Sequence, residues 1–213
     1  MKNNLTELVF ILDRSGSMAG LEKDTIGGFN AAVGRQREVE GECLVTAVLF
    51  NTCSQAVYDR APLDRISPMT GRDYVVGGCT ALLDALGETI THIAKIHRYI
   101  RPEDVPEHTT FVIMTDGMEN ASRRFDVRKV KALIQQQQEK GWEFLFLGAN
   151  IDSVATAGQM GIQADRAVDY CADSQGTANA FETVAEAVCA QRTCAAIPKN
   201  WKARVQRDTD SRR

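Results

Sequence analysis

Short apolar runs alternate along this chain with longer stretches in which apolar residues recur at every third or fourth position. Apolar runs of this kind predict buried strands, and the three- to four-residue period predicts helices that bury one face. Strands are expected at 7–12, 44–50, 55–58, 111–114, 143–147 and 167–170, and helices at 21–39, 82–100, 127–139, from about 153 and at 177–190. This alternation predicts an α/β domain with a mainly parallel sheet.

The clearest helix begins at Leu82, where apolar residues follow one another at three- and four-residue steps and therefore share one face. Pro102 is expected to end it. The run 55–58 is expected to return beside the strand at 44–50 as a short antiparallel edge strand. Residues 60–79 are rich in proline and glycine, so we expect a loop there.

Composition indicates one ordinary globular domain. Of the 213 residues, 44% are hydrophobic and 25% are charged, as in proteins that bury a sizeable core. No apolar run approaches the roughly 18 residues of a membrane helix, and Asp13 closes the first apolar stretch before it could serve as a secretory signal. We therefore expect a cytoplasmic protein with no membrane partner.

The cysteines argue against zinc and against a disulfide framework. They show no CxxC pair and no His/Cys cluster, and no export signal is evident. We expect small buried thiols at all six positions, which are Cys43, Cys53, Cys79, Cys171, Cys189 and Cys194.

Charge is spread unevenly along the chain. The formal net charge is −3, and the segment from Gln191 onward carries seven basic and two acidic residues, which leaves −8 for residues 1–190. An acidic body argues against nucleic-acid binding by the main domain. Because hydrophobic residues are sparse in 191–213, we expect a basic, mobile tail outside the domain of residues 1–190. Trp201 and the basic residues would then offer a second contact point for a partner.

The first candidate ligands for a metal ion lie where the first predicted strand ends. Asp13 closes the apolar run, and Ser15 and Ser17 follow it, with Gly16 allowing a tight turn between them. Hard divalent cations such as Mg²⁺ and Ca²⁺ prefer oxygen ligands, and this segment offers three oxygen-bearing side chains in five residues. It resembles one wall of a cation site.

Two further segments bring oxygen ligands to the same edge of the sheet. Thr80 follows two glycines at the start of the clearest helix, and Asp116 ends the strand at 111–114. In an open parallel sheet, ligands bind outside the carboxyl ends of the strands. Taken singly, Asp-Gly could be a turn, the threonine an N-cap and Ser-Gly-Ser a loop. Their arrival together at strand and helix ends favours a shared site.

These residues together resemble the complete metal-ion-dependent adhesion site (MIDAS) of von Willebrand factor A (vWA) domains. The five matching positions are Asp13, Ser15, Ser17, Thr80 and Asp116. The resemblance extends to Met18 and covers about residues 5–190, and the chain looks like a stand-alone prokaryotic member. It implies a doubly wound, Rossmann-like, mainly parallel sheet with one short antiparallel edge strand and helices on both faces.

The resemblance also implies a role for each ligand. Ser15 and Ser17 would bind Mg²⁺ directly, with Mn²⁺ or Ca²⁺ as alternatives. Thr80 would bind directly in one state and through water in another, and Asp13 and Asp116 would act mostly through bound waters. Neutral hydroxyls leave the charge of the cation under-compensated, so its open coordination position would attract an Asp or Glu side chain of a partner protein.

The residues that follow the predicted strand ends should form the rim that chooses this partner. They are Arg14, Glu119, Asn120, Asn150 and Asp152. The function implied by the resemblance is a metal-dependent adaptor without catalysis of its own, working in an assembly with an AAA-type ATPase or a kinase–phosphatase system.

Two alternatives remain open. A metal-dependent phosphoester hydrolase could use the same cation, with Asp116 or Ser15 as nucleophile. Such chemistry usually needs a general acid or base nearby, whereas His92 and His97 lie far along their helix and His108 precedes its predicted strand. The other alternative is a metal-free scaffold in which the polar groups only cap helices and form turns.

Overall fold

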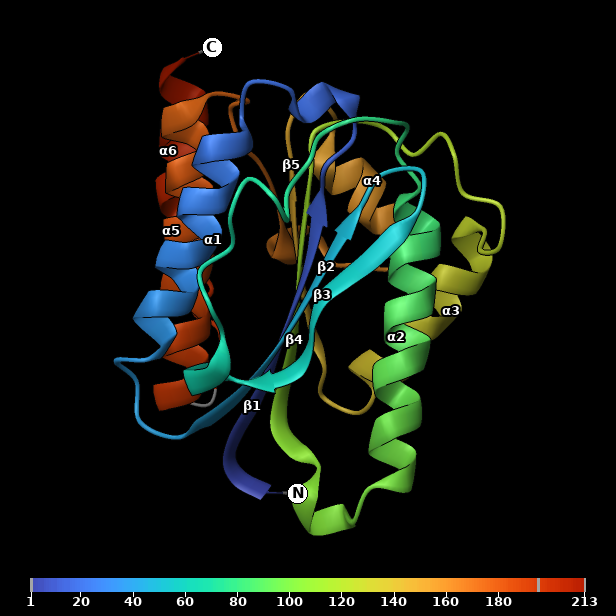
Figure 1. The fold of residues 1–213 in the computed structure, drawn as a ribbon, viewed down its shortest axis with the longest axis vertical. Helices are drawn as coiled ribbons and strands as arrows, with labels where there is room; N and C mark the ends of the chain where they lie inside the picture. Colours follow the sequence, from blue (N-terminus) through green and yellow to red (C-terminus); the bar gives the residue numbers. More distant parts are fainter. Residues whose placement is uncertain (1, 195, 213) are drawn as a thin grey trace.

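A six-stranded sheet in the order β3-β2-β1-β4-β5-β6 organises the molecule (Figure 1). The computed structural model describes residues 2–194 and 196–212, with side chains from residue 4 onward. The strands are β1 (Lys2–Asp13), β2 (Glu42–Phe50), β3 (Ser54–Pro62), β4 (Pro106–Thr115), β5 (Glu143–Gly148) and β6 (Ala167–Asp169). Only β3 runs antiparallel to its neighbour. The predicted mainly parallel sheet with one antiparallel edge strand is confirmed.

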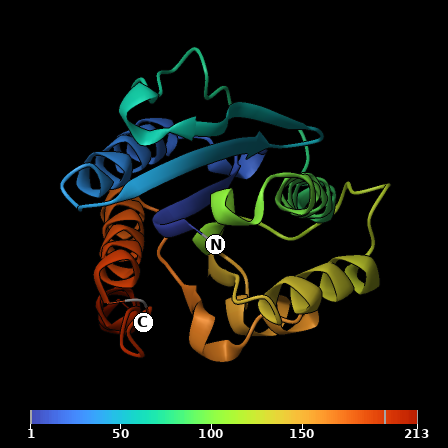
Figure 2. The same cartoon turned by 90° about the horizontal axis from the view of Figure 1, so that it is seen from below.

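Helices cover both faces of the sheet, as Figures 1 and 2 show. One face carries α1 (Glu22–Gln36), α5 (Ser174–Cys194) and α6 (Ala203–Ser211), and the other carries α2 (Leu82–Tyr99), α3 (Val127–Gln138) and α4 (Ser153–Gln159). Side-chain alternation along β1 produces the two layers. Phe10 and Leu12 join the core under α1 and α5, whereas Val9 and Ile11 join the core under α2 and α3.

Element centres agree with the sequence predictions, but several strands are longer. β4 begins at Pro106 rather than at 111, because its polar first half still pairs with β1. β3 runs to Pro62 and a 3-10 turn follows at Leu63–Arg65, so the start of the predicted loop 60–79 is regular structure. Edge strands with mixed exposure carry no continuous apolar run, and the pattern therefore underestimates them.

The prediction of a mobile tail is wrong. α5 continues through Cys194, and α6 follows and packs on the domain. Ile197, Trp201 and Val205 are buried in the same core as α1 and α5. Their four-residue spacing lets a few apolar residues anchor the segment. Trp201, whose indole nitrogen donates to the Asp165 carbonyl at 2.8 Å, is therefore not available as a contact point for a partner.

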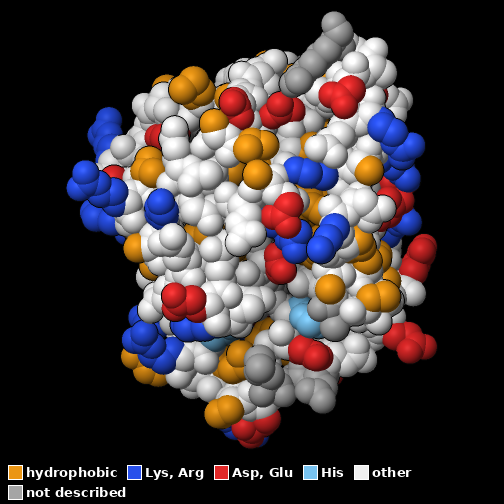
Figure 3. All heavy atoms as spheres, turned by 180° about the vertical axis from the view of Figure 1, so that it is seen from behind, with side chains coloured by type: hydrophobic (Ala, Val, Ile, Leu, Met, Phe, Trp, Pro, Cys, Tyr) orange, Lys and Arg blue, Asp and Glu red, His pale blue; other side chains and the backbone are white. Residues whose placement is uncertain are grey.

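Two basic residues of this segment pair with acidic residues of the body. Arg204 pairs with Glu182 and Glu186 of α5, and Arg212 pairs with Asp173. On the face shown in Figure 3, Lys and Arg side chains are interspersed with Asp and Glu rather than gathered in one large patch. Exposed pairs of this kind contribute about 0–1 kcal/mol each, so apolar burial is the main force that holds α6 in place.

Burial of the cysteines differs from expectation. Cys43 is buried, Cys171 and Cys189 are partly exposed, and Cys53, Cys79 and Cys194 are exposed, so the prediction of small buried thiols holds fully only at Cys43. Among the described residues, no helix combines the length and the apolar character that crossing a membrane requires.

Candidate metal centre

Two carboxylates meet where the central strands end. β1 ends at Asp13 and its parallel neighbour β4 ends at Thr115, with Asp116 as the next residue. The Thr115 hydroxyl donates a 2.6 Å hydrogen bond to Oδ2 of Asp13. Asp13 and Asp116 keep only 1% and 3% of their surface exposed. Both predicted carboxylates therefore lie buried at the carboxyl edge of the sheet.

The turn after β1 places two hydroxyls beside this carboxylate. The backbone NH of Ser15 donates to Oδ1 of Asp13 at 2.7 Å, and a 3-10 turn at Gly16–Met18 follows. The hydroxyl oxygens of Ser15 and Ser17 lie 3.2 Å apart. One short segment thus supplies two neighbouring neutral oxygens next to a buried carboxylate.

Backbone hydrogen bonds hold the loop before α2 against this turn. Gly77 N donates to the Arg14 carbonyl at 2.9 Å, and Gly16 N donates to the Gly78 carbonyl at 3.1 Å. Gly78 has φ +79°, and a Cβ at this position would approach Thr52 Oγ1 to 2.7 Å. The glycine is therefore required both by the left-handed backbone and by the close approach of the loops.

Thr80 does not cap the helix that follows it. α2 begins at Leu82 after Ala81, and side chains of the loop after β4, not that of Thr80, bond to the amides of its first turn. The backbone of Thr80 is engaged, because its N donates to Asn120 Oδ1 at 2.9 Å and its carbonyl accepts from Asn120 N at 3.0 Å. Its hydroxyl makes no hydrogen bond to the described residues. The N-cap interpretation is wrong, and the hydroxyl is free to bind a ligand.

Gly117 shows how closely the three segments approach one another. A Cβ placed on Gly117 would lie 3.4 Å from Ser17 Oγ and 3.8 Å from Thr80 Oγ1. The residue before it is Asp116. The structure therefore brings together all five side chains that the sequence places at this edge.

The buried carboxylates lack a compensating cation. Neither Asp13 nor Asp116 forms an ion pair with Lys or Arg in the described part of the chain. Burial raises the pKa of Asp116, the Asn150 amide that donates to its Oδ1 opposes the rise, and the charge of Asp13 adds to it. The pKa is raised overall, chiefly by burial, so the ionised carboxylate is disfavoured without a cation, and a divalent cation would relieve this.

The donor set suits a hard cation held largely by neutral oxygens. Three hydroxyls and two carboxylates converge, whereas no cluster of three or more His, Cys, Asp or Glu side chains that could hold a metal occurs among the described residues. Mg²⁺ keeps several waters and uses few protein carboxylates. The residues present therefore fit such an ion better than zinc.

Two of the predicted rim residues position the ligands. The Asn120 side chain accepts from the backbone of Thr80, as described above. Asn150 has φ +56°, and its side-chain amide reaches Asp116. Arg14 is half-buried, with Nη1 3.5 Å from the Asp73 carbonyl and with no partner for its buried Nε.

The other two rim residues hold their own loops. Glu119 accepts from Leu83 N at 2.9 Å and from Ser122 N at 2.7 Å, which ties the loop after β4 to the first turn of α2. Asp152 caps α4 by accepting from Ala155 N at 2.9 Å. A role of the rim in choosing a partner stays a prediction.

Sequence reasoning missed Tyr74. This residue is 2% exposed, lies in the loop that precedes α2, and donates its hydroxyl hydrogen to the backbone carbonyl of Asp13. The contact joins residues 61 positions apart. No local pattern could have indicated it, because the fold of an irregular loop alone brings the ring to the site.

Known proteins match this chain in structure but not in sequence. No protein-family model and no curated protein matches the sequence. Among solved structures, proximal thread matrix protein 1 from the mussel byssus matches with a TM-score of 0.59 and 14% identity, covering 87% of this chain and 46% of that chain. The von Willebrand factor type A structure from Catenulispora acidiphila matches with a TM-score of 0.57 and 16% identity, covering 88% and 43%.

A third match is the manganese-loaded TRAP protein of Plasmodium vivax, with a TM-score of 0.50 and 16% identity over 70% of this chain and 58% of that chain. Another crystal structure of the mussel protein has a zinc-occupied MIDAS motif. The chain spans less than half the length of the first two matching chains. At these identities the likeness establishes the fold, and the chain has the fold of vWA domains.

Proposed function

We propose that this chain is a vWA-type protein-interaction domain whose binding depends on a divalent cation. Ser15, Ser17 and Thr80 would hold the ion directly, and Asp13 and Asp116 would hold it through waters. The observation that carries the proposal is the convergence of a free hydroxyl on Thr80 with the Ser15–Ser17 pair beside two buried, unneutralised carboxylates.

An ion bound in this way would keep much of its positive charge. Its inner ligands would be neutral, and the two aspartates would act at a longer distance. We therefore propose that its open coordination position captures an Asp or Glu side chain of a partner protein. Mg²⁺ is the proposed ion, with Mn²⁺ and Ca²⁺ as alternatives. The zinc in the MIDAS motif of one matching structure, together with the manganese loaded into another, supports a divalent cation.

We propose an adaptor without catalysis of its own. His92 bonds to Asp59 of β3 at 3.0 Å, and His97 bonds to Glu7 in the first half of β1. His108 lies within the first half of β4, so the prediction that it precedes this strand is wrong. These placements leave the hydrolase alternative without a histidine beside Asp116. The proposed setting is a cytoplasmic assembly that contains an AAA-type ATPase or a kinase–phosphatase system.

Calorimetric titration with Mg²⁺ and Mn²⁺ tests the metal part of the proposal. Ser15→Ala should abolish binding of the ion, whereas the matched variant Ser67→Ala, at an exposed loop position, should bind like the unaltered protein. Circular dichroism shows whether both variants fold. Equal affinity in the two variants would contradict the ligand assignment.

Capture of partner proteins from native lysate, in the presence of Mg²⁺ or of EDTA, tests whether partner binding depends on the ion. A specific partner should be retained only with the ion, and Ser15→Ala should lose it. Replacing single Asp or Glu residues of the captured protein by Asn or Gln should then identify one residue that is essential for binding. Capture that persists unchanged in EDTA would disprove the mechanism.

A further inference from the structure

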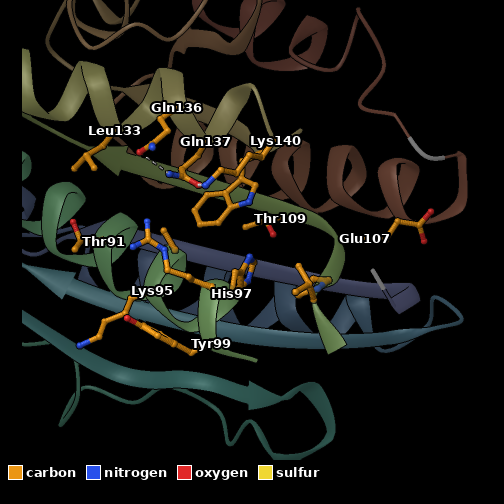
Figure 4. Close-up of a pocket in the computed structure, with 15 residues that line it drawn as sticks. Thr91, Lys95, His97, Tyr99, Glu107, Thr109, Leu133, Gln136, Gln137 and Lys140 are labelled. Carbon is orange, nitrogen blue, oxygen red and sulfur yellow. Dashed lines mark hydrogen bonds between the residues drawn. The ribbon is translucent and has the colours of Figure 1, made fainter. Parts of the chain in front are cut away.

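A cavity lies at the opposite end of the domain from the candidate metal centre (Figure 4). It is lined by the second half of α2, the start of β4, the end of α3 and Trp142. α2 begins and β4 ends beside the metal centre, so the cavity is at the far end of both elements. Its volume is about 780 Å³, within the range of about 300–1,000 Å³ that is common for small-molecule sites.

Trp142 forms a flat apolar wall of this cavity. The indole is 7% exposed and stacks on Phe111 with ring centroids 5.5 Å apart and an interplanar angle of 17°. The imidazole of His97 meets it edge-on at 5.2 Å. Because its neighbours fix the ring, Trp142 offers a rigid surface for a planar apolar group.

Thr109 offers a hydroxyl to the cavity. The residue is 2% exposed and lines the cavity, and its hydroxyl makes no hydrogen bond to the described residues. In Figure 4 it lies between His97 below and Gln137 and Lys140 above. Its position therefore favours a polar group in the cavity.

His97 is held in place by the buried carboxylate of Glu7. Its Nε2 lies 2.6 Å from one carboxylate oxygen of Glu7, a residue with no exposed surface, and the other oxygen accepts from Arg60 Nε at 2.6 Å. Glu7 is also the register partner of Thr109 across β1 and β4. Nδ1 of His97 has no hydrogen-bond partner among the described residues. A rigid imidazole thus lines the cavity with one nitrogen free.

The charges around the cavity favour an anion. Lys95, Arg98 and Lys140 line it, and none of them pairs with a carboxylate in the described part of the chain. The one acidic residue in the lining is Glu107, which accepts from Asn4 N at 2.8 Å and lies apart from the other labelled residues in Figure 4. Several cations around a partly apolar cavity raise the local concentration of anions.

We propose that this cavity binds a small aromatic acid, a planar apolar group that carries a carboxylate or sulfonate. The ring would lie against Trp142, and the anionic group would face Lys140 and Arg98. Thr109 and His97 would hydrogen-bond to polar groups of the molecule. Tyr99, which lines the cavity and is 75% exposed, would cover the bound ring. The site is independent of the proposed metal centre.

Fluorescence titration with anilinonaphthalene sulfonate tests the proposal, with the uncharged phenylnaphthylamine as the comparison probe. We expect saturable binding of the sulfonate at one site, at least about tenfold tighter than binding of the uncharged probe, which corresponds to about 1.4 kcal/mol. The chain has two tryptophans. Energy transfer to the probe should be lost in Trp142→Phe and kept in Trp201→Phe. Equal affinity for the two probes would overturn the proposal.

Charge reversal locates the site. Lys140→Glu should weaken sulfonate binding about tenfold, whereas the matched variant Lys23→Glu on α1 should leave it unchanged. Both lysines are exposed, so both variants should keep the unfolding midpoint of the unaltered protein. NMR amide shifts on titration should centre on residues 95–99, 106–109 and 137–142. Shifts centred elsewhere, or equal affinity in the two variants, would refute the assignment.

Discussion

Thr115 donates a 2.6 Å hydrogen bond to Asp13 and so joins the ends of the two central strands. The other carboxylate oxygen of Asp13 accepts from the backbone of Ser15 at 2.7 Å. Each oxygen of a carboxylate can accept further bonds. Asp13 is thus oriented by protein donors and keeps lone pairs for waters, which is the arrangement expected of a residue that holds a cation indirectly.

Replacing Thr115 by Val should weaken both the fold and the metal site. The change removes the donor to Oδ2 of a buried carboxylate, and a buried acceptor left without its partner costs about 1–3 kcal/mol. Urea unfolding without metal measures this loss. Mg²⁺ titration should show reduced affinity as well. An unaltered Mg²⁺ affinity would mean that the orientation of Asp13 is irrelevant to the site.

Thr80→Ala should separate metal binding from stability. The hydroxyl of Thr80 makes no hydrogen bond to the described residues, so without metal the variant should lose only the burial of one methyl group, about 0.8 kcal/mol. A ligand at one hundred times its Kd stabilises the folded state by about 2.7 kcal/mol. Thermal unfolding with Mg²⁺ should show this gain in the unaltered protein and in Thr80→Ser, but much less in Thr80→Ala. Equal gains in all three would contradict the assignment of Thr80.

Asp116 should make the metal-free protein sensitive to pH. Its pKa is raised in the folded state, chiefly by burial. The folded protein therefore holds this proton more tightly than the unfolded chain, and the resulting stability is lost as the pH rises through the folded pKa. At neutral pH, Asp116→Asn should make the metal-free protein more stable and should abolish its response to Mg²⁺. A loss of stability in this variant would contradict the proposed cost of burying the ionised carboxylate.

Cys43 should contribute to alkaline unfolding. Burial raises its pKa from 9.0 to about 11. Above pH 9 the unfolded chain releases this proton while the folded protein keeps it, so stability falls as the pH rises from 9 to 11. The loss is about 2–3 kcal/mol. Unfolding free energies measured across this range should fall less steeply in Cys43→Ala, and equal slopes would argue against the assignment.

Trp201→Ala should destabilise the domain although the residue lies near the C-terminus. Removing a buried tryptophan costs about 3–5 kcal/mol, and Trp201 is 7% exposed. Tyr99→Ala is a suitable control, because Tyr99 is 75% exposed and its loss should cost less than about 0.5 kcal/mol. Denaturant unfolding compares them. Equal stability of the two variants would support the prediction of a mobile tail.

The sequence indicated the sheet and the candidate ligands because both depend on local signals. β1 and β4 are apolar runs that end in oxygen-bearing residues, and parallel strands bring such ends to one edge. Gly77 and Gly78 marked the loop that brings Thr80 to this edge. These features follow from residue type and spacing alone.

Long-range packing explains what the sequence did not reveal. α6 is mostly polar, and its attachment depends on a few residues such as Trp201 and Val205 that meet α5 and β6 only in the folded chain. Tyr74, Asn120 and Asn150 support the ligands through contacts whose partners lie 34 to 61 positions away in the chain. Residue type alone does not distinguish them from ordinary loop residues.

The hydrogen bonds that connect residues 14–16 to residues 77–78 join main-chain atoms alone. Binding of an ion would therefore order little additional backbone. Substitutions at Ser17 or Thr80 would change the ligand atoms without disrupting these backbone hydrogen bonds. The metal preference of the site can therefore change through substitution of a single ligand residue, while the backbone of the loops stays the same.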